Sequence, residues 1–238
     1  MTRWTEARLG GFSLLFGTVA VAVGYAFSPG RGMVDTVPST SLADLTLAMA
    51  RNATLSYTVA VVLVLGALLM LNGIVTLRRY TAPVPRLGLL GMAVGAFLQM
   101  VMRGFDYMLI GMGEAALGPD PTESAQWLES ALGMQRTVWG LHFTGSVAGY
   151  AGMAILAFGL ISRPEPLRLP SVVNGIVALL ALGSLALFIA AWHSNTLELR
   201  LAPVFGLMSA SGIVYMGLLG WRLAVSGAGE DARESSIG

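Results

Sequence analysis

Three polar residues on one side of an apolar stretch are the strongest candidates for chemistry in this chain. Gln99, Arg103 and Asp106 follow one another at spacings of four and three, which puts them on one helical face. A charged side chain at mid-membrane depth costs at least about 2.5–3.5 kcal/mol, so this face is expected to look into a helix bundle or an aqueous cavity. An Arg103–Asp106 ion pair is the simplest local arrangement. It would either hold helices together or form the polar floor of a substrate or proton site.

The two histidines of the chain, His142 and His193, are the next candidates. Both are expected in the same half of a bundle as Asp106, with His193 closer to the membrane interface. A single outward-facing polar cluster is therefore geometrically possible. The candidate ligand- or ion-binding residues are Gln99, Arg103, Asp106, Tyr107 and His142, and the candidate cofactor ligands are His142 and His193.

Three chemistries stay open for this cluster. A single haem would take His142 and His193 as axial ligands, which requires the two rings to face each other at one depth. A copper site would add Met108 or Met112 as soft ligands, although methionine is also ordinary packing material. Proton-linked transport would titrate Asp106 or His142 as a cavity opens, but the paired discontinuous helices of many carriers are not evident.

Composition excludes several other chemistries. All 14 basic residues are arginine and there is no cysteine, so a retinal Schiff base, disulfides, thiolate nucleophiles and iron–sulfur clusters are ruled out. A formal net charge of +1 gives no reason to expect nucleic acid as a partner. The chain also lacks a Walker loop, a dinucleotide glycine motif and a metalloprotease His-Glu-x-x-His.

The segment Ser209-Ala210-Ser211-Gly212 resembles the Gly-x-Ser-Gly motif of rhomboid intramembrane proteases. Those enzymes need a histidine on a later helix as the base for the serine, and both histidines here precede Ser211. The first glycine of the motif is also missing. We therefore interpret Ser209, Ser211 and Gly212 as a small-residue packing face.

Six long apolar runs would position these side chains. Hydrophobic residues make up 55% of the 238 residues. Charged residues make up only 11%, whereas an average soluble domain has about 25% charged residues. Each run reaches the roughly 19 residues that a helix needs to cross a hydrocarbon core, and backbone groups in lipid must be satisfied within the segment. The predicted helical spans are residues 9–27, 54–77, 87–113, 137–162, 169–192 and 201–221.

The arginines predict the orientation of these spans. One end of the bundle would carry Arg3, Arg8, Arg78, Arg79, Arg86, Arg163, Arg168, Arg222 and Arg233. The positive-inside rule assigns that end, and with it both termini, to the cytoplasm. The predicted fold class is thus an all-α, multi-pass inner-membrane bundle, one domain over residues 1–238 with a short polar tail at 225–238. A cleaved signal peptide in place of the first span is the alternative, and would leave five spans.

Two outer loops are predicted to contain short amphipathic helices. Residues 41–51 and 123–134 both show apolar side chains at helical spacing, as helices that lie on a membrane surface do. Within the spans, small residues four apart predict close helix packing, as at Gly91 and Gly95 or at Gly145 and Gly149.

The layout of the whole chain resembles a family of bacterial and archaeal six-helix membrane proteins that is known only as a domain of unknown function. The resemblance depends on the opening Arg8–Gly11, a long outer loop before the second span, the link Leu169–Ser171 and the closing Gly220–Leu223. It implies a fold, but no activity and no catalytic residue.

The leading hypothesis from the sequence is non-enzymatic. It is a small membrane protein that binds a hydrophobic or small polar ligand, or a membrane subunit of a homo-oligomer or larger complex in the lipid bilayer. The first alternative is a proton-coupled transporter that uses the Arg103–Asp106 face. The second is a single-haem redox protein that uses His142 and His193.

Overall fold

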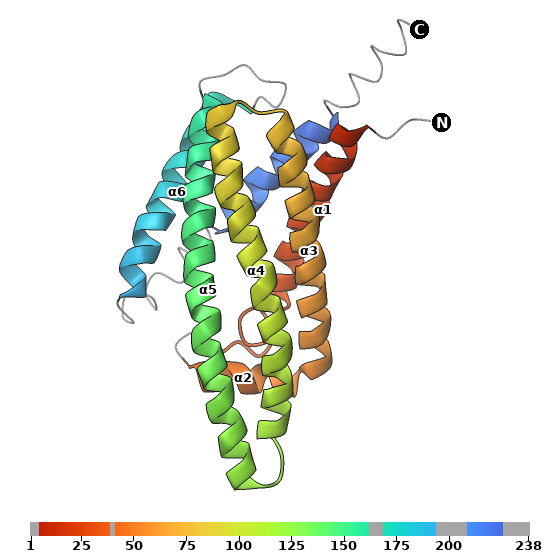
Figure 1. Ribbon diagram of the computed structural model, residues 1–238, viewed down its shortest axis with the longest axis vertical. Helices are drawn as coiled ribbons and strands as arrows, with labels where there is room; N and C mark the ends of the chain where they lie inside the picture. Colours follow the sequence, from red (N-terminus) through yellow and green to blue (C-terminus); the bar gives the residue numbers. More distant parts are fainter. Residues whose placement is uncertain (1–4, 39–40, 162–168, 194–208, 226–238) are drawn as a thin grey trace, which may run out of the picture.

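The computed structural model describes residues 5–38, 41–161, 169–193 and 209–225, and these contain helices but no strand. Figure 1 shows the helices gathered into one bundle. The elements are α1 (Glu6–Ala26), α2 (Leu42–Arg51), α3 (Ala53–Arg79), α4 (Pro83–Ala116), α5 (Pro121–Ile161) and α6 (Ser171–Trp192). Residues 209–225 are also helical. The predicted polar tail from residue 226 on, the link 163–168 and the first part of the sixth predicted span, 201–208, lie outside the described residues.

Five of these helices, α1, α3, α4, α5 and α6, are long and apolar enough to cross a membrane. Large apolar side chains point outward from them, including Phe16, Phe97 and Leu179, of which Leu179 is 72% exposed. Lipid is the natural solvent for an apolar surface of this extent, because soluble monomers rarely expose contiguous apolar patches. The chain is therefore a multi-pass, all-helical membrane protein.

The bundle is built from antiparallel neighbours. α1 packs along α3, and α4 packs along α5, which also contacts α6. The helix at 209–225 packs against α1, where a Cβ added at Gly220 would lie 2.8 Å from the Gly11 carbonyl oxygen and 2.9 Å from the Leu15 nitrogen. Because this helix is antiparallel to α1, the beginning of α1 and residue 225 lie at the same end of the bundle (Figure 1).

Glycines bring α4 and α5 into backbone contact. A Cβ added at Gly152 would lie 2.6 Å from both the Gly88 oxygen and the Met92 nitrogen, closer than real Cβ atoms approach. A Cβ at Gly91 would lie 3.0 Å from the Ala148 oxygen, and one at Gly95 would lie 2.9 Å from the Gly145 oxygen. The predicted small-residue packing is thus confirmed for this helix pair, where dispersion contacts replace the hydrophobic driving force that lipid does not supply.

The prediction of a separate surface helix at residues 123–134 is wrong. These residues form the first turns of α5, which continues without a break for 41 residues to Ile161. At 1.5 Å per residue α5 is about 62 Å long, twice the roughly 30 Å of a hydrocarbon core. The helix begins where the Asp120 carboxylate accepts a hydrogen bond from the Thr122 amide at 2.8 Å, and no proline interrupts it afterwards. Figure 1 shows the α4–α5 hairpin projecting beyond the other helices.

The predicted helix at residues 41–51 is present as α2, but its apolar side packs on protein. Leu45 and Met49 are only 4% and 5% exposed and belong to a buried cluster with Met102 and Leu109 of α4. The Gln135 amide of α5 donates a hydrogen bond to the α2 residue Thr46, at 3.3 Å. α2 therefore packs across the bundle near the end from which the α4–α5 hairpin projects (Figure 1).

Candidate functional site

A cavity of about 740 Å³ lies in the middle of the bundle. All five long helices, residues 209–214 and Met216 contribute to its wall. Most of the lining is apolar and includes Leu63, Met70, Met92, Met153, Val177 and Met216. Its volume falls within the roughly 300–1,000 Å³ typical of sites that hold a small molecule. We call it the central cavity.

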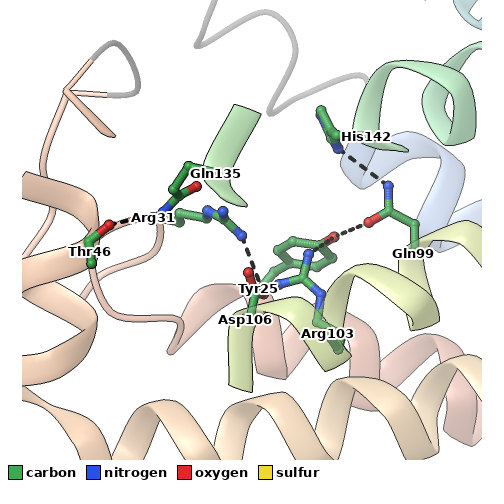
Figure 2. Close-up of polar contacts among 8 residues, drawn as sticks. All are labelled: Tyr25, Arg31, Thr46, Gln99, Arg103, Asp106, Gln135 and His142. Carbon is green, nitrogen blue, oxygen red and sulfur yellow. Dashed lines mark hydrogen bonds and ion pairs between the residues drawn. The ribbon is translucent and has the colours of Figure 1, made fainter. Parts of the chain in front are cut away.

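A chain of polar contacts crosses the bundle at one end of this cavity (Figure 2). We call it the polar chain, and its members are Arg31, Asp106, Arg103, Tyr25, Gln99 and His142. It joins α1, the loop after α1, α4 and α5. Helices that are far apart in the sequence are therefore held together by side chains that would each be costly to bury alone.

The charged part of the polar chain is almost completely buried. Arg103 and Asp106 are 4% and 3% exposed, and the Arg103 guanidinium donates to the Asp106 carboxylate at 2.5 Å. Arg31 approaches the same carboxylate oxygen at 3.6 Å. The predicted Arg103–Asp106 pair is therefore present, with a second cation that the sequence did not assign to it. Two arginines face one carboxylate, which leaves this end of the cavity with an excess of positive charge.

The neutral part of the polar chain continues from Arg103 to α5. A second Arg103 nitrogen donates to the Tyr25 hydroxyl at 3.2 Å, and the guanidinium carbon lies 5.2 Å from the centre of the Tyr25 ring. The Tyr25 hydroxyl donates to the Gln99 carbonyl oxygen at 2.8 Å. The Gln99 amide nitrogen lies 3.4 Å from Nδ1 of His142.

The loop after α1 positions Arg31 by its backbone conformation. Gly30 has a φ of +79°, a left-handed conformation that glycine adopts without the steric cost paid by other residues. Its amide donates to the Val34 carbonyl at 2.9 Å, and its carbonyl accepts from the Val37 amide at 3.1 Å. This tight loop turns the chain back over the end of α1, so that Arg31 reaches α4 (Figure 2).

A second cavity of about 360 Å³ adjoins the polar chain on the side of α2. We call it the outer cavity. It is lined by Arg31, by Leu45 of α2 and by the aromatic residues Trp139, Phe188 and Trp192. The two cavities share Tyr25, Arg103, His142, Tyr150 and Ser209 in their walls. These five residues therefore form a waist between an apolar chamber and an aromatic one.

Aromatic stacking fixes α6 beside the waist. The ring of Phe188 lies edge-on to His142 with 5.8 Å between centroids, and Trp192 lies 5.3 Å from Trp139. Phe143 contacts both Phe188 and Trp192, whose rings also contact each other with 5.6 Å between centroids. Aromatic pairs of this kind contribute about 0.5–1.5 kcal/mol beyond the burial of area, so the cluster holds α6 against α5 beside His142.

The structure brings together four of the residues predicted from the sequence, Gln99, Arg103, Asp106 and His142, and leaves two outside. Tyr107 is 51% exposed and packs against Tyr57 with the rings tilted by 53° and 4.5 Å between their centroids. His193 is exposed at the end of α6, and its backbone amide bonds to the Ala190 carbonyl.

Within the described ranges, the structure does not bring His142 and His193 together as a haem or copper site would require. The described side-chain contacts of His142 are with Gln99 and Phe188 and do not include His193. Met108, a predicted soft ligand, is 53% exposed. In the described ranges no group of three or more His, Cys, Asp or Glu side chains is arranged to hold a metal ion.

Sequence reasoning missed Tyr25 and Arg31 as site residues and interpreted Ser209 as packing. Tyr25 lies in the last turn of α1. Its predicted depth in the membrane, close to that of Gln99, is the one feature of the sequence that points to this contact. Ser209 lines the waist, with its hydroxyl 3.3 Å from that of Tyr150. Gly212 does have the predicted packing role, because a Cβ there would lie 2.8 Å from the Met153 side chain.

Comparison with protein-family models, with curated proteins and with solved structures found no match to this chain. The resemblance to a six-helix family stays a prediction.

Proposed function

We propose that this protein crosses the inner membrane six times and binds one small amphipathic molecule inside the bundle. The polar group of the ligand would lie at the waist, and its apolar part would fill the central cavity. The observation that carries this proposal is the 740 Å³ apolar cavity, which ends on the hydrogen-bonding groups of buried Arg103 and of partly buried Tyr25 and His142. A molecule with one polar and one apolar end matches that division.

The orientation is supported by the distribution of charge. The described arginines Arg8, Arg78, Arg79, Arg86 and Arg222 all lie at the end of the bundle where α1 begins. The opposite end carries arginines mixed with several acidic residues, such as Asp35, Asp44 and Glu123. The positive-inside rule therefore favours cytoplasmic termini, and the waist and outer cavity would lie in the outer half of the membrane.

The contacts of Asp106 favour ligand binding over proton-coupled transport. Asp106 binds both Arg103 and Arg31, and it lines neither cavity. A carboxylate in that place orients two cations and does not meet a substrate or solvent path directly. Its contacts are those of a positioning group.

The test is to fill the central cavity without disturbing the fold. Gly149 lines that cavity, and a Cβ added there would meet no atom within 4 Å, so the side chain in Gly149→Leu would project into empty space. Gly140 lies on the same helix, is exposed, lines neither cavity and would also meet no atom within 4 Å. Gly140→Leu is therefore a matched control.

Both variants and the unaltered protein would be purified in the same mild non-ionic detergent. Their bound small molecules would then be extracted and quantified by mass spectrometry. We expect an amphipathic molecule to copurify in a fixed ratio with the unaltered protein and with Gly140→Leu, and to be lost from Gly149→Leu. Equal amounts in the two variants would contradict the proposal.

A further inference from the structure

The charged side chains that line the two cavities all have the same sign. Arg103 lines both cavities and Arg31 lines the outer one. In the part of the chain that the structure describes, neither lining contains an aspartate or a glutamate, and Asp106 is buried behind the two arginines. Among the described residues, Arg103 and Arg31 with Asp106 behind them therefore present one positive charge in excess at and beside the waist, where water screens the buried Arg103 weakly.

The direction of the hydrogen bonds gives the waist a second property. Arginine can only donate, so the Tyr25 hydroxyl accepts from Arg103 and gives its own proton to the Gln99 carbonyl oxygen. The Gln99 amide nitrogen then faces His142 as a donor, so Nδ1 of His142 accepts. In the neutral imidazole the proton is consequently on Nε2. The chain of contacts thus leaves His142 with a donor, and no acceptor, for any further partner.

From these two properties we infer that the ligand is a single-chain amphiphile with a monoanionic head that only accepts hydrogen bonds, as in a long-chain carboxylate. The head would contact Arg103, Arg31 and the Nε2 proton of His142. Its single negative charge would neutralise the excess charge of the two arginines over Asp106. The hydrocarbon chain would extend between Met92, Met153 and the other apolar residues of the central cavity. This inference rests on the proposed function and adds the chemical class of the ligand to it.

The experiment compares three probes with the same sixteen-carbon chain and different heads: hexadecanoate, hexadecanol and hexadecyltrimethylammonium. Each would be titrated into the purified full-length protein in a non-ionic detergent at pH 8, and bound copies would be counted by native mass spectrometry. We expect one hexadecanoate per protein, bound about tenfold more tightly than either other probe. That ratio corresponds to one charge-assisted hydrogen bond.

Arg31→Gln tests the source of the preference. This change removes the excess positive charge and leaves the buried Arg103–Asp106 pair intact, so folding should persist. Arg31 is 24% exposed and its distance to Asp106 is the longer of the two. We expect hexadecanoate to bind Arg31→Gln about tenfold more weakly, with little change for hexadecanol. Arg136→Gln is the matched control, because Arg136 is exposed at the same end of the bundle, lines neither cavity and should leave all three affinities unchanged.

The outcomes separate this inference from the proposed function. If hexadecanol binds as tightly as hexadecanoate and both are lost in Gly149→Leu, the cavity binds amphiphiles but the anionic head is wrong. Preference for the ammonium probe would overturn the inference in the same way. If no probe binds while an amphipathic molecule still copurifies and is lost from Gly149→Leu, the inference fails and the proposed function stands. If Gly149→Leu binds every probe as the unaltered protein does, both fail.

Discussion

At the scale of single residues, the geometry of the waist depends on the ion pairs that Asp106 makes with two arginines. Asp106 is a buried carboxylate that receives Arg103 at 2.5 Å and Arg31 at 3.6 Å, and its Oδ1 atom has no hydrogen-bond partner in the described structure. Replacing such a network with apolar side chains can be harmless, whereas removal of one member leaves the others buried without compensation. Asp106 is thus the residue on which the geometry of both arginines depends.

Asp106→Asn should lower the free energy of unfolding by about 3–5 kcal/mol, because it leaves the Arg103 guanidinium buried without its counter-charge. The measurement is reversible unfolding in mixed micelles followed by circular dichroism. The control is Glu6→Gln, which breaks an ion pair with Arg79 in which both side chains are more than half exposed. That change should cost no more than about 1 kcal/mol. Equal effects of the two changes would show that the buried pair has no special structural role.

At the scale of helices, the contact between α4 and α5 decides where the polar side chains of the site meet. Gln99 and Arg103 project from α4, and His142 and Tyr150 project from α5. The glycine contact between Gly88 and Gly152 holds these helices at backbone distance on one side of the cavity. A wider separation would carry His142 away from Gln99, whose nitrogen lies 3.4 Å from the ring.

Gly152→Ala should destabilise the protein by about 1–3 kcal/mol, because the added methyl would press on the backbone of α4. The control is Gly140→Ala, where the methyl meets no atom within 4 Å. That variant should be unchanged, or more stable by up to about 1 kcal/mol from improved helix propensity. The two variants would be compared by the same micelle unfolding experiment. If Gly152→Ala is as stable as Gly140→Ala, the close contact between the backbones of α4 and α5 does not contribute to the stability of the protein.

At the scale of the whole molecule, the orientation in the membrane decides which compartment the outer cavity faces. The chain has no cysteine, so a single introduced cysteine reports its own side of the membrane without background. Val84 is exposed at the beginning of α4, and Gln126 is exposed on the hairpin that projects from the opposite end of the bundle.

A maleimide that cannot cross membranes should label Gln126→Cys in intact expressing cells. It should label Val84→Cys only after the cells are permeabilised, because the positive-inside rule puts the arginine-rich end in the cytoplasm. The readout is the mass increase of the purified protein. The reverse pattern would invert the orientation and would place the waist in the inner half of the membrane.

Local periodicity accounts for what could be predicted from the sequence. The apolar runs predicted the membrane helices, and spacings of four and three predicted that Gln99, Arg103 and Asp106 share a face and that the last two form a pair. These features depend on helix geometry over one or two turns. The uninterrupted length of α5 is not evident from the sequence, because polar Gln135 and Arg136 separate the amphipathic segment from the apolar run that follows.

Only the tertiary structure decided which distant residues complete the site. Tyr25 meets Gln99 across 74 residues of sequence, and Arg31 reaches Asp106 through a glycine-dependent loop. His142 lies at the waist because packing sets the rotation of α5, whereas His193 follows the last residue of α6 and is exposed. The sequence by itself thus determined the membrane class and the charged face of α4. The cavity, its positive waist and the donors that line it arise from contacts between helices, which no local spacing encodes.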